Sequence, residues 1–324
     1  MMKRNKVSYI NKHTGVFLIL ASILVISALF SPSFVAPNNL LAMLRQASSL
    51  GILTIGQLFV IIGGGVDLSV ESILQMAITI FMYGYNNFGD AGLIYGLIAA
   101  FIFGAFAGLI NGILVIRFNV QPFLTTLFTG SIITGIRMIW VGIESAGHVP
   151  ELIRFFGRDK TLNIPNAVIV LLLVAIIAGV ILNKHVYGRK LIAVGTSFTT
   201  SVYSGIRSHR TVVFSYIISG VMAVLASIII SGYIGYADRW IGAGMSFNSL
   251  IAAVIGGNYL GGGRGSVIGA IGGALLMTII VNFVILLGLP ASYQHIFSGL
   301  VLIATIFIGS LSKKISLQNL IGRQ

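Results

Sequence analysis

The chain has very few charged residues and no cysteine. Of its 324 residues, 8% are charged and 56% are hydrophobic, whereas a soluble domain carries about 25% charged residues. The absence of cysteine excludes disulfides, thiolate metal sites and cysteine nucleophiles. Only seven residues are acidic, and no acid–histidine cluster falls within an apolar segment. An enzyme is therefore not expected.

Other common site motifs are also missing. The histidines are scattered with no pair at metal-ligand spacing, and no G-x-x-x-x-G-K-[ST] sequence occurs. We therefore expect no metal or cofactor in this chain. If transport here consumes ATP, another chain must bind and hydrolyse it.

The chain does have long apolar runs. About 20 apolar residues cross a bilayer, and ten apolar segments predict an all-α integral membrane protein, a single transmembrane domain over residues 1–324. The first segment resembles a signal peptide, but no A-x-A-like cleavage site follows it, so we interpret it as a span. The ten segments are 14–31, 47–63, 69–85, 91–116, 123–142, 165–182, 212–231, 248–260, 266–287 and 294–311.

The positive charges predict an orientation. With the amino end in the cytoplasm, ten spans place 14 of the 20 Lys and Arg residues on the inner side, and Lys and Arg in short loops favour the cytoplasm. Both termini are therefore predicted to be cytoplasmic. The same distribution assigns the net charge of +13 to a membrane surface and argues against nucleic-acid binding.

Two glycine-rich breaks interrupt the apolar segments, at 63–69 and 256–266. Span two would run inward and span seven outward, so spans 2–5 and 7–10 are predicted to be inverted repeats with glycine-broken helices. In transporters such breaks lie near the substrate path; chance similarity of glycine-rich turns is the alternative. The break residues are Gly63, Gly64, Gly65, Asp67, Ser69, Glu71, Gly256, Gly257, Gly263 and Gly265.

Two carboxylates lie at the first break. Asp67 or Ser69 can cap the helix that follows, and Glu71 falls in its first turn, where the dipole favours an anion by about 0.3–1 kcal/mol. An i,i+4 spacing would put both carboxylates on one face, where a cation such as Arg264 would have to lie close to keep both charged. We predict that Asp67 is structural and that Glu71 faces the inner aqueous side, a polar cavity or a partner.

The inner connection 183–210 is too long and too patterned to be a simple turn. A short amphipathic helix is expected there, which packs against a protein or lies on lipid headgroups. Gly195 permits a turn within it, and Gly205 can end its last helix. Its apolar positions are Leu191, Ile192, Val194, Val202 and Ile206.

Four blocks, in order along the chain, resemble the ribose-type sugar permeases of bacterial ABC importers, within the branched-chain amino acid and sugar permease superfamily. They are TIGQLFVIIGGGVDLSVESIL at 54–74, GLINGILVIRFNVQPFLTTL at 108–127, YGRKLIAVGTSFTTSVYSGI at 187–206 and IAAVIGGNYLGGGRGSVIGAIGGALL at 251–276. The chain departs from the family at Glu71, where glycine is usual, at GTSFTT (195–200) and near Gln57.

The resemblance implies the transmembrane subunit of an ATP-driven importer in the bacterial inner membrane. It would pair with a second permease subunit, identical or different. It would receive a sugar or sugar-like solute from an extracytoplasmic binding protein, and a cytoplasmic ABC ATPase would drive it. The departures leave the sugar and the partners open. Segment 183–210 would dock on the ATPase through Gly188, Arg189, Gly195, Ser204, Gly205 and Ile206.

The candidate substrate path consists of residues inside spans, most of them polar. Each polar side chain can instead bridge two helices, at about 0.6 kcal/mol, and Phe123 can stack on a sugar ring or pack in the core. The alternative function is an ion- or proton-coupled secondary transporter that uses Asp67 and Glu71 and needs neither an ATPase nor a docking segment. The path residues are Gln57, Gln75, Asn111, Phe123, Asn248 and Asn282.

Overall fold

The computed structural model describes residues 7–141 and 147–289, together with 293, 294, 296, 299, 300 and 303. Six helices in these residues are long and apolar enough to cross a membrane. The predicted all-α membrane protein is therefore confirmed, while the count of ten spans is not. The six are α2 (Pro37–Ile62), α3 (Val70–Arg117), α4 (Pro122–Val141), α6 (Asn166–Asn183), α9 (Ser208–Ile234) and α11 (Val267–Leu286).

The remaining elements are shorter or less apolar. Among them α1 matches the first predicted segment, and its apolar part is Val16–Phe30. They are α1 (Val7–Phe30), η1 (Pro32–Val35), α5 (Glu151–Gly157), α7 (Val186–Thr196), α8 (Phe198–Tyr203), α10 (Met245–Ile255), and the two-residue strands β1 (Gly147–His148), β2 (Lys160–Thr161), β3 (Ile164–Pro165) and β4 (Tyr236–Ala237).

Helix α3 is a hairpin of two arms. Its 48 residues would extend about 72 Å as one helix, more than twice the hydrocarbon thickness. At Gly89 the backbone adopts φ 62° and ψ −147°, a conformation open to glycine, and the chain turns back on itself. A Cβ at Gly96 would lie 2.7 Å from the Cα of Phe81, so the arms touch. The third and fourth predicted segments are these arms.

Helix α10 is shorter than a membrane span, contrary to the prediction for the eighth segment. It covers Met245–Ile255, 11 residues or about 16 Å, about half of the hydrocarbon thickness. The predicted span 248–260 is therefore wrong as a full crossing, because the chain turns at Gly257, where φ is +84°. The last predicted segment, 294–311, lies almost entirely outside the described residues.

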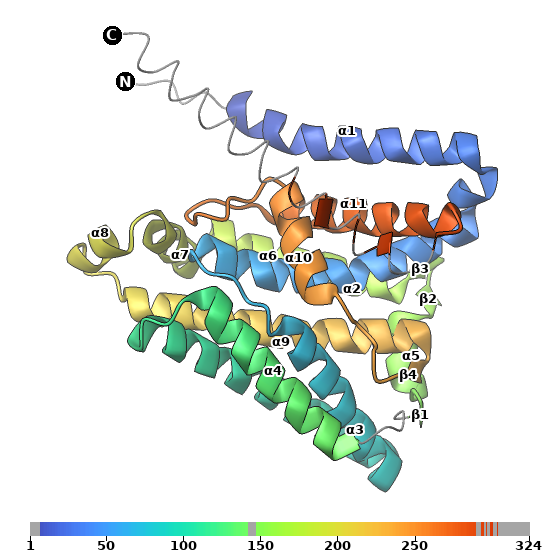
Figure 1. Cartoon of the computed structure of the whole chain (residues 1–324), viewed down its shortest axis with the longest axis horizontal. Coiled ribbons are helices and arrows are strands. Elements are labelled where there is room, and N and C mark those ends of the chain that lie inside the picture. Colours follow the sequence, from blue (N-terminus) through green and yellow to red (C-terminus); the bar gives the residue numbers. More distant parts are fainter. Residues whose placement is uncertain are drawn as a thin grey trace.

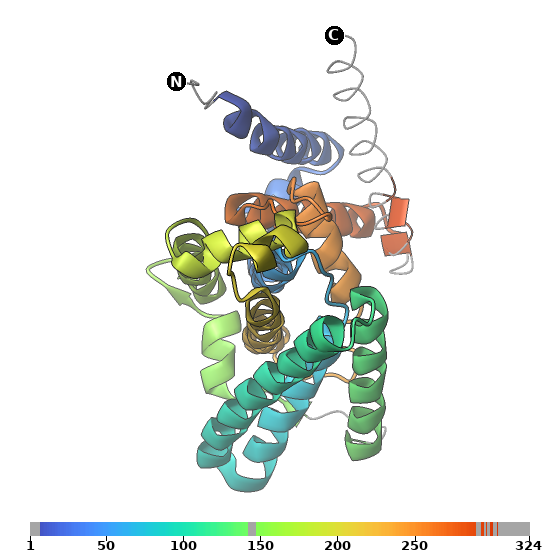
Figure 2. The ribbon, with the colours of Figure 1, turned by 90° about the vertical axis from the view of Figure 1, so that its left-hand side faces the viewer.

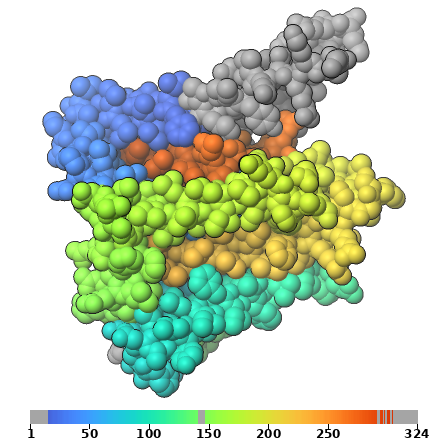
Figure 3. All heavy atoms as spheres, turned by 180° about the vertical axis from the view of Figure 1, so that it is seen from behind, coloured from blue at the N-terminus to red at the C-terminus, as the bar shows by residue number. Residues whose placement is uncertain are grey.

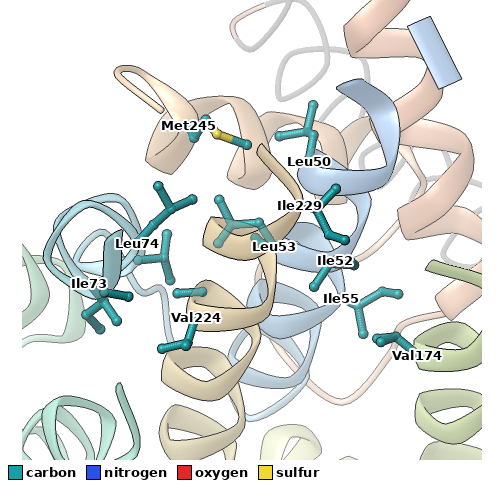
Figure 4. Packing of buried hydrophobic residues seen from close by; sticks show 14 of the residues in the cluster. Leu50, Ile52, Leu53, Ile55, Ile73, Leu74, Val174, Val224, Ile229 and Met245 are labelled. Atoms are coloured by element: carbon teal, nitrogen blue, oxygen red, sulfur yellow. The ribbon is translucent and has the colours of Figure 1, made fainter. Parts of the chain in front are cut away.

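Helix α2 forms the centre of the bundle, and every residue from Ala47 to Ile62 is buried. Apolar residues occur on every side of this stretch, with only four polar residues among them, as expected of a helix surrounded by protein. Helices α9, α11, α6 and α10 pack around it. Figure 4 shows Leu53 and Ile55 of α2 among Leu74 of α3, Val174 of α6 and Val224 of α9.

The outer helices present apolar side chains to their surroundings. Helix α6 lies across the face seen in Figure 3, and its outward side chains are large and apolar. A surface of this kind is stable against hydrocarbon, whereas a soluble protein rarely exposes a contiguous patch of this size. The exposed residues on α6 are Leu172, Leu173, Ile176, Ile177 and Val180.

The second arm of α3 packs on α9 through glycines four residues apart. A Cβ at Gly104 would lie 2.7 Å from the carbonyl oxygen of Gly220, and one at Gly112 would lie 2.7 Å from the Cα of Val213. Between them, a Cβ at Gly108 would overlap the carbonyl oxygen of Tyr216. Small residues at this spacing let membrane helices approach closely. The sequence analysis above does not predict this contact.

The two ends of the bundle differ in structure and charge. Helices α7 and α8 lie at one end, while α5 and the strand pairs β1–β4 and β2–β3 lie at the other (Figures 1 and 2). In the described chain, the loops and helix ends on the α7–α8 side contain one acidic residue, Asp67, which is fully buried where the loop after α2 turns inward. Their basic residues are Arg117, Lys184, Arg189, Lys190, Arg207, Arg210 and Arg264.

Candidate functional site

The first glycine break returns the chain to the interior of the bundle. Helix α2 ends at Ile62, Gly64 adopts φ +89°, and the chain runs without regular structure to Ser69 before α3 begins. The Leu68 N–H donates to Thr126 Oγ1 of α4 (3.0 Å). Thr126 thus accepts from a backbone N–H that has no helical partner at the break. It was not among the site residues predicted from the sequence.

Asp67 contacts the start of α3 through a turn rather than through the predicted helix cap. Its Oδ1 accepts hydrogen bonds from Ser69 N (3.0 Å) and Ser69 Oγ (2.6 Å). Asn111, in the second arm of α3, donates Nδ2 to Ser69 Oγ (2.8 Å). The Gln57 amide pairs with the Asp67 backbone, donating to the carbonyl (3.0 Å) and accepting from the N–H (3.2 Å). All four residues are buried.

Helices α3 and α10 begin in the interior and meet at their N-termini (Figure 1). Glu71 Oε2 accepts from the Ser246 N–H of α10 (3.3 Å), and the Glu71 N–H donates to Ser246 Oγ (3.3 Å). Ser246 Oγ in turn donates to the Leu68 carbonyl (2.7 Å). Gly244 precedes α10 and offers no side-chain cap. Glu71 therefore satisfies an N–H of the first turn of α10 from another helix.

The two carboxylates consequently do not share a helix face. Asp67 lies before the first helical residue and contacts Ser69, while Glu71 contacts Ser246, so the i,i+4 expectation is wrong. Arg264, expected as a nearby cation, is exposed in the loop after α10. The arginine whose charge interacts with Glu71 is Arg137 of α4.

Arg137 is buried near the end of α4, with 5% of its surface exposed. Its Nη2 donates to the Arg239 carbonyl (2.9 Å). Burial and the charge of Arg239 disfavour its charged form, and the charges of Asp238 and Glu71 offset this only in part. An arginine inside an apolar span is costly and usually functional. That rule could have identified Arg137 from sequence, where it was assigned only to the outer end of a span.

The second glycine break joins the first. The Gly263 N–H donates to the Ile62 carbonyl at the end of α2 (2.8 Å). Asn258 holds the loop by donating to the Ala253 carbonyl (2.7 Å) and accepting from the Ser266 N–H (2.7 Å). The two breaks that the sequence separates by almost 200 residues are therefore in direct contact.

Gly195 of α7 lies against this contact. A Cβ at Gly195 would overlap the Ile62 carbonyl oxygen and lie 2.5 Å from the Gly263 nitrogen. Gly195 does not turn the chain, contrary to expectation. The helix continues to Thr196, and extended Ser197 separates α7 from α8 and caps α8 by accepting from the Thr200 N–H (3.3 Å).

Some of the apolar residues predicted in segment 183–210 are buried against this chain, and others are exposed. Leu191 and Val194 of α7 are buried against this chain itself, because α7 packs on α2, α6 and α9. Tyr187 donates to the Thr211 carbonyl (3.2 Å), and burial raises the pKa of its hydroxyl. The exposed apolar surface is on α8, at Phe198, Val202 and Tyr203.

The other predicted coupling residues are placed as follows. A Cβ at Gly188 would overlap the Leu182 carbonyl, and exposed Arg189 donates to the Lys184 carbonyl (3.0 Å). Ser204 donates to the Thr200 carbonyl (2.9 Å). Gly205 adopts φ +75° just after α8, which confirms that it ends this helix, and Ile206 packs between α2 and α9.

The structure gathers only part of the predicted substrate path. Gln57 pairs with the Asp67 backbone, and Asn111 bonds to Ser69, which itself bonds to Asp67. Asn282 of α11 instead donates to Gln46 Oε1 (2.9 Å), a bridge to α2. Gln75 is buried in α3, Asn248 is half-buried on α10 and Phe123 is exposed on α4.

A matched pair of variants tests the cap on α10. Glu71→Ala is expected to lower the free energy of unfolding by about 0.5–2 kcal/mol, the usual cost of losing a helix N-terminal acceptor. Glu71→Gln keeps an acceptor oxygen and should stay close to the wild type. Thermal unfolding in detergent measures both. Equal destabilisation by Gln and Ala would show that the charge beside Arg137 matters rather than the cap.

Comparison with known proteins identifies the class. Residues 39–306 match the family described as "Branched-chain amino acid transport system / permease component", and the chain belongs to this family of transport permeases. The resemblance to ribose-type permeases is confirmed by its relatives. The chain is 31% identical over 307 residues to the ribose import permease protein RbsC of Bacillus subtilis (strain 168), covering 91% of each chain.

Two further relatives agree with this assignment. RbsC of Escherichia coli (strain K12) is 28% identical over 307 residues, covering 93% of this chain and 94% of the relative. The D-allose transport system permease protein AlsC of the same organism is 31% identical over 306 residues, covering 93% and 92%. No solved structure gives a significant match to the chain.

Proposed function

We propose that the chain is the transmembrane subunit of an ATP-driven importer that passes a sugar or sugar-like solute into the cytoplasm. Its family is one of transport permeases, and the relatives named above are permeases for ribose and D-allose. A soluble extracytoplasmic protein delivers the solute, a cytoplasmic ABC ATPase binds the ATP, and a second permease subunit, identical or different, completes the complex in the inner membrane.

The observation that carries this proposal is the meeting of α3 and α10. Both helices start inside the bundle, and Glu71 joins their N-termini. Transporters place solute sites where broken helices meet at mid-membrane, because free helix N-termini present N–H donors. We place the solute path beside this junction and propose Glu71, Arg137 and half-buried Asn248 as polar groups that line it.

The remaining spans are proposed to follow the inverted repeat. The breaks 63–69 and 256–266 lie one in each half, after segments two and eight, and they touch at Ile62 and Gly263. The corresponding elements are the third segment, which starts α3, and the eighth, which is α10, and these meet at Glu71 and Ser246. Equivalent elements of two inverted halves meet in this way around a pseudo-two-fold axis. The ten-span count includes the last segment, outside the described residues.

We assign the α7–α8 end to the cytoplasm. The loops and helix ends described there are basic, and their one acidic residue, Asp67, is fully buried; the excess of Lys and Arg follows the positive-inside rule. With an even number of spans, both termini would share that side. On this assignment, α8 presents Phe198, Val202 and Tyr203 to the cytoplasm, where apolar side chains in water need a covering surface. The ATPase would supply it.

A cysteine cross-link tests the docking. Thr199 is exposed on α8, and the chain has no native cysteine, so Thr199→Cys offers one reactive thiol. It should form a disulfide with a cysteine placed in a groove of the ATPase, and ATP should change the yield. Ser201→Cys is the matched control, because Ser201 is 4% exposed and should not react.

The same preparation distinguishes the alternative function. Uptake into proteoliposomes should require the ATPase and ATP. A secondary transporter would take up solute without the ATPase and would give no cross-link at Thr199→Cys. Either result, obtained with folded protein, would contradict the importer.

A further inference from the structure

Buried polar atoms without a partner gather at the first break. Of the seven such side-chain atoms in the described chain, four are oxygens in this region: Asp67 Oδ2, Asn111 Oδ1, Tyr216 Oη and Ser219 Oγ. Buried polar groups nearly always find a hydrogen-bond partner. Four exceptions from three parts of the chain therefore need a common explanation.

The existing hydrogen bonds bring two of these oxygens together. Ser69 Oγ donates to Asp67 Oδ1 and accepts from Asn111 Nδ2. Because the Ser69 hydroxyl has one proton, this arrangement fixes the Asn111 amide with its nitrogen toward Ser69. Asn111 Oδ1 and Asp67 Oδ2 then remain as two acceptors with no donor.

Helix α9 supplies the other two oxygens. Ser219 Oγ approaches the Asp67 carboxylate and Tyr216 Oη approaches the Val66 backbone, but neither contact has the full geometry of a hydrogen bond. Tyr216, almost one turn earlier, has its hydroxyl against Gly65 and interacts electrostatically with Asp67. Polar groups that lie close together without well-formed hydrogen bonds often share a third body between them.

The charge of Asp67 needs compensation even more than the unpaired oxygens do. Its side chain is fully buried, and no residue in the described ranges forms an ion pair with it. An isolated carboxylate is very costly in a medium of low dielectric constant. Hydroxyl and amide groups can orient toward the charge, but they do not neutralise it.

We propose that these four oxygens bind a monovalent alkali cation, Na⁺ or K⁺. All are hard ligands, which favour alkali and alkaline-earth ions over zinc or copper. One carboxylate balances one positive charge, whereas a divalent ion would leave an excess charge in the membrane interior. The ion ties the segment after α2 to the second arm of α3 and to α9. It is a fixed structural ion, and the proposal requires no ion transport.

Cation-dependent stability tests this site on the purified full-length chain in detergent. Melting temperature is measured against NaCl, KCl and N-methyl-D-glucamine chloride at constant ionic strength. We expect a saturable rise of about 5 °C with Na⁺ or K⁺, the effect of a ligand near 100 times its Kd on a chain of this size. The organic cation, too large for the site, gives none. Binding of radioactive ²²Na⁺, and its displacement by K⁺, checks occupancy directly.

Variants assign the response to these residues. Ser219→Ala removes one ligand and should raise the half-saturating cation concentration about tenfold or more. Asp67→Asn removes the charge and should abolish the cation response while keeping the shape of the side chain. Ser227→Ala is the control, because Ser227 is a buried hydroxyl on the same helix that donates only to its own helix, at the Val224 carbonyl; its response should match the wild type.

Two results would overturn the proposal. Equal melting temperatures in all three salts, with no ²²Na⁺ bound, would show that the cluster holds no ion. A melting temperature that changes with pH but not with the cation, in the wild type and not in Asp67→Asn, would show that a proton neutralises Asp67 instead.

Discussion

Gly108→Val is expected to abolish most of the folded protein. Gly108 lies at a close contact between the second arm of α3 and α9, where a Cβ would overlap the Tyr216 carbonyl and lie 2.9 Å from the Cα of Ile217. Both obstacles are backbone atoms, so no rotamer change relieves them. Overpacking of this kind costs about 1–3 kcal/mol and often more. Here the cost falls on the most extensive helix contact in the chain.

The measurement is the yield of monodisperse protein by size-exclusion chromatography, with the melting temperature of whatever folds. Gly179→Val is the matched control, since a Cβ at Gly179 on α6 meets nothing within 4 Å. It should express normally. If Gly108→Val folded as well as Gly179→Val, α3 and α9 would not be held at the distance that the structure shows.

The sequence predicts where the helices lie along the chain, but it predicts less well which of them cross the membrane. Apolar runs locate α2, α4, α6, α9 and α11, because lipid and buried helix surfaces both require them. The same apolarity cannot tell whether a run crosses the bilayer or enters it halfway. Helix α10 has the composition of a span, but only the glycines at 244 and 256 limit its length.

In the candidate site too, the sequence predicts some features and misses others. Asp67 is recognisable from the glycines before it, and the structural role predicted for it is consistent with its hydrogen bonds. The i,i+4 rule failed because it applies within a helix, and Asp67 precedes one. Ser246, which completes the junction, lies 175 residues from Glu71. No local pattern can relate residues at that separation.

The apolar stripe of segment 183–210 illustrates an ambiguity of amphipathic patterns. Leu191 and Val202 look equivalent in sequence, since each requires a covering surface. The chain itself covers Leu191, whereas Val202 is 42% exposed. The docking surface that we propose is therefore smaller than the pattern suggests and lies on α8, while α7 connects α8 to the interior of the bundle.

Gly195 lies where α7 contacts the interior of the bundle, and we expect a substitution there to have a large effect on transport. A side chain there would overlap the Ile62 carbonyl and crowd the Gly263 nitrogen, so it would separate α7 from the hydrogen bond that joins both glycine breaks. If ATPase closure moves α8 and α7, this contact is the route by which the movement reaches α3 and α10. Gly195→Val is expected to lower ATP-driven uptake about tenfold or more, the result of about 1.4 kcal/mol of added barrier. ATP hydrolysis by the assembled complex should continue.

Uptake into proteoliposomes and ATP hydrolysis are measured on the same preparation, and Gly195→Ala should fall between the wild type and Gly195→Val. Thr199→Val, an exposed change on α8 of similar shape, should leave uptake nearly normal because it touches neither break. A parallel fall of uptake and hydrolysis in Gly195→Val would indicate failed docking instead. Normal uptake in that variant would show that the junction of Gly195, Ile62 and Gly263 does not transmit the ATPase movement.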